Sequence, residues 1–249
     1  MISSSPTDST ARSWAVLLGL ACGLGGIAAL AASATGYRLG WWPVTTALSL
    51  AEYAAYAAML GLIFSLVGLA VARRRRAGRG IVLGLLGLVA ALPVVAMAAQ
   101  WEYAARGHPP INDISTDTAD PPVFWDMPNP SEYPGGRTAA LQREAYPDMA
   151  PLSLALTPQR AFALALAIAR DSGWEVVAEV PDEGRIEAVA TTLLYGFEDE
   201  VAIRILPAEG GAVVDLRSRS RLGRSDLGTN AARISRFLAE LRARAGEEK

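Results

Sequence analysis

The sequence has very little cysteine and histidine. Cysteine forms disulfides, and both residue types are common in metal sites and catalytic sites. Its 249 residues include one cysteine, Cys22, and one histidine, His108. A single cysteine cannot form a disulfide within the chain and excludes a metal site made of several cysteines. His108 adjoins two prolines and no recognisable nucleophile, and G-x-S-x-G, Walker and G-x-G-x-x-G motifs are absent. We therefore predict no metal, no cofactor and no catalytic residue.

Acidic residues are scarce in the first hundred positions, which contain only Asp8 and Glu52 against seven arginines. The rest of the chain contains 23 acids and 16 bases, so the two parts carry formal charges of +5 and −7. Binding to phosphates requires a clustered positive field. The acidic second part therefore argues against nucleic acid as a partner.

Long apolar runs dominate the first part of the chain, at residues 14–34, 50–72 and 81–100. Each is close to the ~20 residues with which a helix crosses ~30 Å of hydrocarbon. Trp41 follows the first run and Trp101 the third, and aromatic rings prefer such interfacial positions. We expect a membrane domain over residues 1–103 with three transmembrane helices in the lipid bilayer.

Arg73-Arg74-Arg75-Arg76, followed by Arg79, separates the second apolar run from the third. Short loops rich in arginine stay on the cytoplasmic side of a membrane. The sequence therefore predicts a multi-pass protein of the inner (cytoplasmic) membrane with its N-terminus in the cytoplasm. Everything after Trp101 would lie outside the cytoplasm, which is the periplasm in a bacterium with two membranes.

The first apolar run has a second interpretation, as a signal peptide. Ala32-Ser33-Ala34 resembles an A-x-A cleavage site, and Arg12 supplies a weakly positive start. However, a run of about 20 apolar residues exceeds the 7–15 residues of an ordinary signal core. We expect the helix to be retained, and either outcome leaves the rest of the chain on the same side.

A proline-rich segment, residues 104–151, follows the membrane domain and is called the strap below. Residues 105–151 hold nine of the fifteen prolines, a density that opposes regular helix or central strand. The strap also contains Ile111, Phe124 and Trp125, which a flexible linker would lack. We expect an extended, ordered strap that lies on a folded domain.

The remaining residues, 152–249, show the pattern of an α+β domain. Thr157 and Pro158 predict the start of a helix that continues to residue 171. Four strands are expected at 174–180, 185–194, 200–206 and 212–220, and a last helix at 225–243 with Ser225 as its N-cap. The predicted fold is three transmembrane α-helices followed by an α+β domain with the order helix, four-stranded antiparallel sheet, helix.

Two polar signatures resemble those of a known bacterial family. Residues 111–122 read INDISTDTADPP, and residues 217–234 read RSRSRLGRSDLGTNAARI. Between them, residues 185–197 are similar to the central strand and Gly-Phe turn of the same family. The family is called domain of unknown function 1499, and the resemblance covers roughly residues 107–241. It implies no activity, and it is compatible with a membrane-attached envelope protein.

The same signatures contain the candidate site residues. Arg217, Arg219 and Arg221 lie two apart on one predicted strand and therefore share a face. With Arg204 on the preceding strand, they are compatible with a small anion site. Ser225, Thr229 and Asn230 at a helix start would add donors to it, and Asp226 suits the dipole of that helix. Asp113, Thr116 and Asp117 offer oxygens that a cation would accept, although their spacing matches no EF-hand loop. We prefer a network in which the arginines hold Asp113 and Asp117, so that the strap is tied to the sheet.

Two classes of function fit this organisation. The first is a non-enzymatic domain, displayed on the membrane, that binds an envelope protein or a small anionic ligand. The alternative is an envelope hydrolase that uses the Asp113/Asp117 and Arg217–Arg221 cluster. A transporter subunit is disfavoured, because Glu52 is the only charged residue within the apolar runs. The two leading hypotheses differ in whether the charged groups face a cleft or each other.

Overall fold

The computed structural model describes residues 14–128 and 132–247. The chain forms two compact units, Met1–Tyr103 and Ala104–Lys249. The second is called the α+β unit here. Each unit is described by itself.

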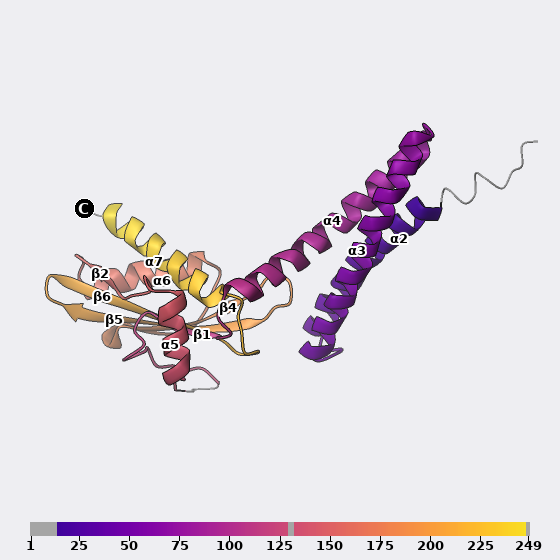
Figure 1. Ribbon diagram of the computed structural model, residues 1–249. Coiled ribbons are helices and arrows are strands. Elements are labelled where there is room, and N and C mark those ends of the chain that lie inside the picture. The colour runs from indigo at the N-terminus through magenta and orange to yellow at the C-terminus, as the bar shows by residue number, and fades with distance from the viewer. Residues whose placement is uncertain (1–13, 129–131, 248–249) are drawn as a thin grey trace, which may run out of the picture. The chain divides into compact units, whose positions relative to one another are not determined.

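Three long helices make up the first unit: α2 (Trp14–Arg38), α3 (Val44–Arg74) and α4 (Gly78–Gly107), whose last residues belong to the second unit (Figure 1). All three are long and apolar enough to cross a membrane. The prediction of three such helices is confirmed. Arg75, Arg76 and Ala77 form the whole connection between α3 and α4, so the arginine cluster occupies the end of α3 and this turn.

Small residues bring these helices together. Ser65 of α3 is fully buried, and a Cβ added at Gly19 of α2 or at Gly87 of α4 would overlap its Oγ. Within the described part of the chain, the Ser65 Oγ has no hydrogen-bond partner. Helices in lipid associate through such close packing, because moving an apolar side chain from lipid to a helix interface gives no hydrophobic gain in free energy.

The α+β unit contains an antiparallel sheet of six strands instead of the four predicted. The order is β1-β6-β5-β4-β3, and β2 also pairs with β6. The strands are β1 (Asp113–Ser115), β2 (Leu152–Leu154), β3 (Glu175–Val180), β4 (Arg185–Thr191), β5 (Glu198–Ala208) and β6 (Gly211–Ser220). The two missed strands have three residues each, too few for an alternating pattern to be recognised. They lie one after the other along the same edge of β6.

The helices of this unit correct two further predictions. Helix α5 (Gly136–Ala145) forms inside the strap, where no regular helix was expected, because the ten residues after Gly135 contain no proline. The last helix, α7, spans Thr229–Glu247 and does not start at Ser225. Leu227 and Gly228 have positive φ angles of 55° and 82°, so the chain turns there before the helix begins.

The main core lies between the sheet and two helices on one of its faces, α6 (Pro158–Asp171) and α7 (Figure 1). Inward residues of β4, β5 and β6 alternate with outward ones, as in Val201, Ile203 and Ile205. Trp174 stacks on Phe237 of α7 with ring centroids 5.4 Å apart. Thr157 caps α6 as predicted, since its side chain accepts a hydrogen bond from the Arg160 N–H. The opposite face of the sheet carries the charges.

Candidate functional site

The face of the sheet turned away from α6 and α7 carries charged side chains from β4, β5 and β6. It is called the charged face below. Its charged members come from three adjacent strands and from the residue that follows β6, and are Arg185, Glu187, Glu198, Glu200, Arg204, Asp215, Arg217, Arg219 and Arg221. The strap covers this face, and Phe124 and Met127 pack there against Val189 and Ala202. Most of these charges are therefore enclosed between sheet and strap, whereas Glu198 at the margin is about half exposed.

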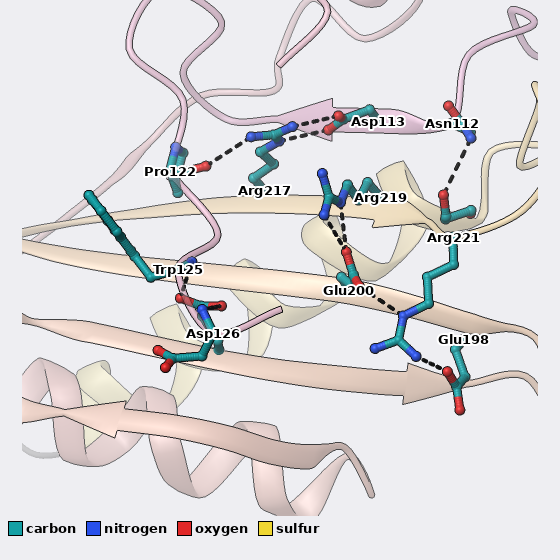
Figure 2. A network of polar contacts seen from close by, with 12 residues as sticks. Asn112, Asp113, Pro122, Trp125, Asp126, Glu198, Glu200, Arg217, Arg219 and Arg221 are labelled. Carbon is teal, nitrogen blue, oxygen red and sulfur yellow. Dashed lines mark hydrogen bonds and ion pairs between the residues drawn. The ribbon is translucent and has the colours of Figure 1, made fainter. Parts of the chain in front are cut away.

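Arg217 joins the first signature to the second. Its guanidinium donates two hydrogen bonds to Asp113, of 2.9 and 2.7 Å, and a weaker one of 3.3 Å to the carbonyl of Pro122 (Figure 2). Only 2% of the Arg217 side chain and 6% of the Asp113 side chain are exposed. Two parallel N–H···O bonds to one carboxylate form the strongest arginine pairing geometry. The predicted contact between Asp113 and the arginine strand is present.

Aromatic rings complete the surroundings of these arginines. The Arg217 guanidinium lies 4.9 Å from the centroid of Phe124 and 5.5 Å from that of Tyr133, and Arg219 lies 4.3 Å from Phe124. A cation over an aromatic face is attracted by the ring quadrupole, more strongly when water is excluded. Burial, together with the negative charge of Asp113, raises the pKa of Tyr133 to about 12.

Glu200 bridges the other two arginines of the signature. It accepts a hydrogen bond of 2.7 Å from Arg219 and one of 2.8 Å from Arg221, and Arg221 also pairs with Glu198 (Figure 2). The sequence interpretation missed Glu198 and Glu200. The alternation of polar and apolar residues in 198–206 could have revealed Glu200. Because Val201, Ile203 and Ile205 face the core, Glu200 must point to the opposite face of the sheet, the face that also carries Arg219.

Glu187 holds the strap by its backbone. Its carboxylate, which is not exposed, accepts hydrogen bonds from the N–H groups of Trp125 and Asp126 at 2.8 and 3.0 Å. Arg185 pairs with the same carboxylate at 2.8 Å and also with Asp126. Burial opposes the charge of Arg185, but the hydrogen bonds to Asp126, Glu183 and Glu187 outweigh it and raise the pKa of that guanidinium.

Arg204 forms a third attachment of the strap. It donates hydrogen bonds to the side chain of Asp120 at 2.9 Å, to the Asp120 carbonyl at 2.7 Å, and to Asp215 of β6. Burial raises the pKa of Asp215, and the hydrogen bonds from Arg204 oppose that effect. Thr116 fills the gap between β1 and β2, since its N–H donates to the Leu216 carbonyl and its hydroxyl accepts from the Leu216 N–H at 2.9 Å.

The other predicted site residues lie elsewhere. Asp117 was expected to be held by the arginines, but its carboxylate accepts hydrogen bonds from the N–H groups of Ala119 and Asp120, which makes a turn within the strap. Ser225 accepts one from the Leu227 N–H and precedes the last helix. Asp226, not Ser225, supports the start of α7, because its two oxygens accept from the N–H groups of Gly228 and Asn230 at 2.9 and 2.8 Å.

Asn230 belongs to the opposite side of the sheet from the arginines. Its carbonyl oxygen accepts a hydrogen bond from Ser218 at 2.7 Å, and its amide donates to the Asn112 carbonyl at 3.0 Å. Ser218 alternates with Arg217 and Arg219 along β6, so it points to the α7 side. The structure thus divides the predicted residues into a buried ion-pair network and a separate helix-start network.

A depression of about 390 Å³ lies apart from both networks. It is bordered by α7 and by the segment between α5 and β2, with Tyr146, Met149, Leu238 and Arg242 among its lining residues. None of the predicted site residues lines it. Among residues 14–128 and 132–247, no group of three or more histidine, cysteine or acidic side chains is arranged to hold a metal ion.

The ion-pair network coincides with the part of the chain that has known relatives. Residues 113–241 match a family model described as protein of unknown function (DUF1499). The chain belongs to this family. The matched region, just over half of the chain, begins at Asp113 and includes Arg217, so the family region contains both ends of the central ion pair. No curated protein matches the chain.

Proposed function

We propose that the chain is an integral membrane protein whose α+β unit works outside the cytoplasm as a non-enzymatic interaction domain. The three apolar helices support the membrane attachment. The five arginines in and beside the turn between α3 and α4 support the orientation, because short arginine-rich connections remain in the cytoplasm. In a bacterium with two membranes, the domain would face the periplasm from the inner membrane.

The observation that carries the proposal is the way the strap presents Trp125. Its backbone is held by Glu187, while Arg217 contacts the nearby carbonyl of Pro122. Phe124 is 1% exposed and packs on the sheet, so it anchors the strap. The next residue, Trp125, is 68% exposed. Val123 is 52% exposed beside it. Buried charges therefore fix an apolar pair that faces outward.

Such a pair suits recognition of another protein. Tryptophan is enriched among the residues that dominate binding energy, and a fixed backbone loses little conformational freedom on association. Three partly exposed acidic side chains belong to the same attachments of the strap: Asp126 and Glu183, which pair with Arg185, and Asp120, which pairs with Arg204. Complementary charge then favours an envelope protein with an apolar pocket and a basic rim.

The contacts of the charged face favour this role over the two other candidates. A small anionic ligand would need the guanidinium groups of Arg217, Arg219 or Arg221, and each of these already binds a carboxylate of the domain. A hydrolase would need a carboxylate able to exchange a proton with a substrate. Asp113 and Glu200 are instead buried against arginines.

The test compares cross-linked partners of the full chain in native membranes. The wild type and Trp125→Ala are cross-linked in cells, and captured proteins are quantified by mass spectrometry. Loss of the tryptophan anchor is expected to reduce capture of the partner about tenfold. Val177→Ala, which removes a 45% exposed apolar side chain from β3, is the matched control and should leave capture unchanged. Equal capture by wild type and Trp125→Ala would refute the role of the strap.

A further inference from the structure

Two loops at one end of the sheet expose leucine side chains. The first loop, residues 192–197, joins β4 to β5, and the second, residues 221–228, joins β6 to α7. They are neighbours, because the Arg221 N–H donates a hydrogen bond of 3.1 Å to the Glu198 carbonyl. Leu193 is 94% exposed, Leu194 39% and Leu222 47%. These three residues are called the leucine tip.

The first loop is built in a way that holds its leucines outward. The N–H of Thr192 donates to the Phe197 carbonyl and the Thr192 hydroxyl accepts from the Phe197 N–H, both at 2.8 Å. Tyr195 is 3% exposed and stacks on Phe197 with ring centroids 5.1 Å apart. The aromatic rings therefore occupy the inner positions of the loop, and its two leucines are left at the surface.

The chain arrives from α4 at this same end of the sheet. The Asn112 side chain donates a hydrogen bond of 2.8 Å to the Gly223 carbonyl in the second loop, and the Ile111 carbonyl accepts one from the Asp226 N–H. The third apolar run ends near residue 100, and residues 101–107 extend its helix by only about 10 Å. Residues 108–110 add at most about 10 Å more, so in a chain anchored through the third apolar run this connection limits how far the leucine tip can lie from the membrane surface.

We propose that the leucine tip inserts into the lipid–water interface of that membrane. Apolar side chains are stabilised at the boundary between head groups and acyl chains, and exposed Arg224 in the second loop is suited to a lipid phosphate. The covalent tether makes the contact intramolecular, so a few side chains suffice where free association would need more. The surface is separate from Val123 and Trp125, so the domain contacts lipid and its protein partner through different faces.

The test uses the full chain in lipid nanodiscs of phosphatidylcholine with one copy in each disc. In a Cys22→Ser background, Leu193→Cys is labelled with a fluorophore, and lipids with a spin label near the head group act as the quencher. Val177→Cys provides the control, because Val177 is also exposed but lies on β3. Lipid quenching at position 193 should exceed that at position 177 about threefold, and aqueous iodide should give the reverse order. Equal behaviour of the two positions would overturn the proposal.

A second pair of variants separates insertion from mere proximity. Leu194→Glu together with Leu222→Glu, with the label kept at position 193, should reduce lipid quenching to the level of position 177. Val123→Glu adds a charge at another exposed apolar position and should leave quenching at 193 unchanged. Circular dichroism verifies that each variant is folded. Quenching that survives both glutamates, or that appears only with two copies in a disc, would show that the tip does not insert into lipid.

Discussion

In the membrane helices, neighbouring helices touch through glycine and serine, which have little or no side chain. In the α+β unit, by contrast, the strap is held to the sheet by arginine side chains that pair with carboxylates. Gly19 and Gly87 approach Ser65 so closely that an added Cβ at either position would overlap it. Arg217 instead reaches Asp113 on the neighbouring strand β1 with its long side chain, although the two residues are 104 positions apart in the chain. The difference follows from the surroundings in which each part folds.

Lipid offers no hydrophobic gain for helix association, so contact area and close approach must provide the attraction. Charged side chains would be costly there, and the apolar runs 14–34, 50–72 and 81–100 contain one, Glu52, which accepts a hydrogen bond from Tyr56 on the exposed side of α3. In the α+β unit, the main core is already formed by α6 and α7 on one face. The second face can then bury charges, provided that each one is paired.

The largest expected effect concerns the charge difference between the two parts. A reporter enzyme that is active only outside the cytoplasm, fused after Lys249, should be active, and the same fusion within residues 73–79 should be silent. Replacing the five loop arginines with glutamine should give a mixed orientation, because little else biases insertion. Activity of the loop fusion in the wild-type sequence would reverse the proposed orientation.

The next effect is the cost of breaking the central ion pair. In residues 104–247 expressed alone, Arg217→Ala and Asp113→Ala should each lower the free energy of unfolding by about 3–5 kcal/mol, because each leaves an uncompensated buried charge. The double variant should lose less than the sum, as expected for residues in one network. Urea denaturation measures all three.

The control for this cycle is an ion pair at the surface. Arg170 pairs with Glu179, and the side chains are 57% and 47% exposed. Arg170→Ala should therefore change stability by only about 0–1 kcal/mol. If the two buried variants were as mild as this control, or strictly additive, the strap would not depend on the Asp113–Arg217 pair.

A smaller effect is expected in the membrane helices. Gly19→Ala should destabilise the full chain in mixed detergent micelles by about 1–3 kcal/mol, since the added methyl group would overlap the backbone of Ser65 and force the helices apart. Gly25→Ala is the matched control, because an added Cβ there meets no atom within 4 Å. Unfolding is followed by the loss of helical circular dichroism. Equal stability of the two variants would mean that the contact at Ser65 does not hold the bundle.

The smallest effect is a shift in the titration of one phenol. Tyr133 has its pKa raised from 10.0 to about 12 by burial, so the folded state keeps a proton that the unfolded state releases. The stability linked to this group is present below pH 10 and is lost as the pH rises towards 12. The difference in phenolate absorbance between wild type and Tyr133→Phe gives the titration of this residue. A midpoint near 10 would show that the strap leaves Tyr133 in water.

Much of the architecture could be predicted because it depends on local patterns. The three apolar runs, the Thr157 cap and the four longer strands follow from length and periodicity in neighbouring residues. Strands β1 and β2 could not be predicted in this way, because three residues carry no period. The start of the last helix was misplaced by four positions, because Asp226 supports it through a turn that Leu227 and Gly228 form with positive φ.

The candidate site shows where local pattern stops being sufficient. Spacing along one strand correctly placed Arg217, Arg219 and Arg221 on one face, and the two signatures pointed to Asp113 as a partner. The roles of Glu187 and Glu200 depend on the register between β4, β5 and β6, which brings side chains from different strands side by side. Sequence spacing carries no information about that register.

The sequence by itself determined the apolar lengths, the charge asymmetry and the faces of the long strands, since these follow from the order of adjacent residues. Only the tertiary structure decided which carboxylate meets which arginine, and that Trp125 stays outside while Phe124 is buried. The physical reason is that an ion pair requires atoms within a few ångströms of each other. For residues about a hundred positions apart, that distance is set by strand register and by the path of the strap.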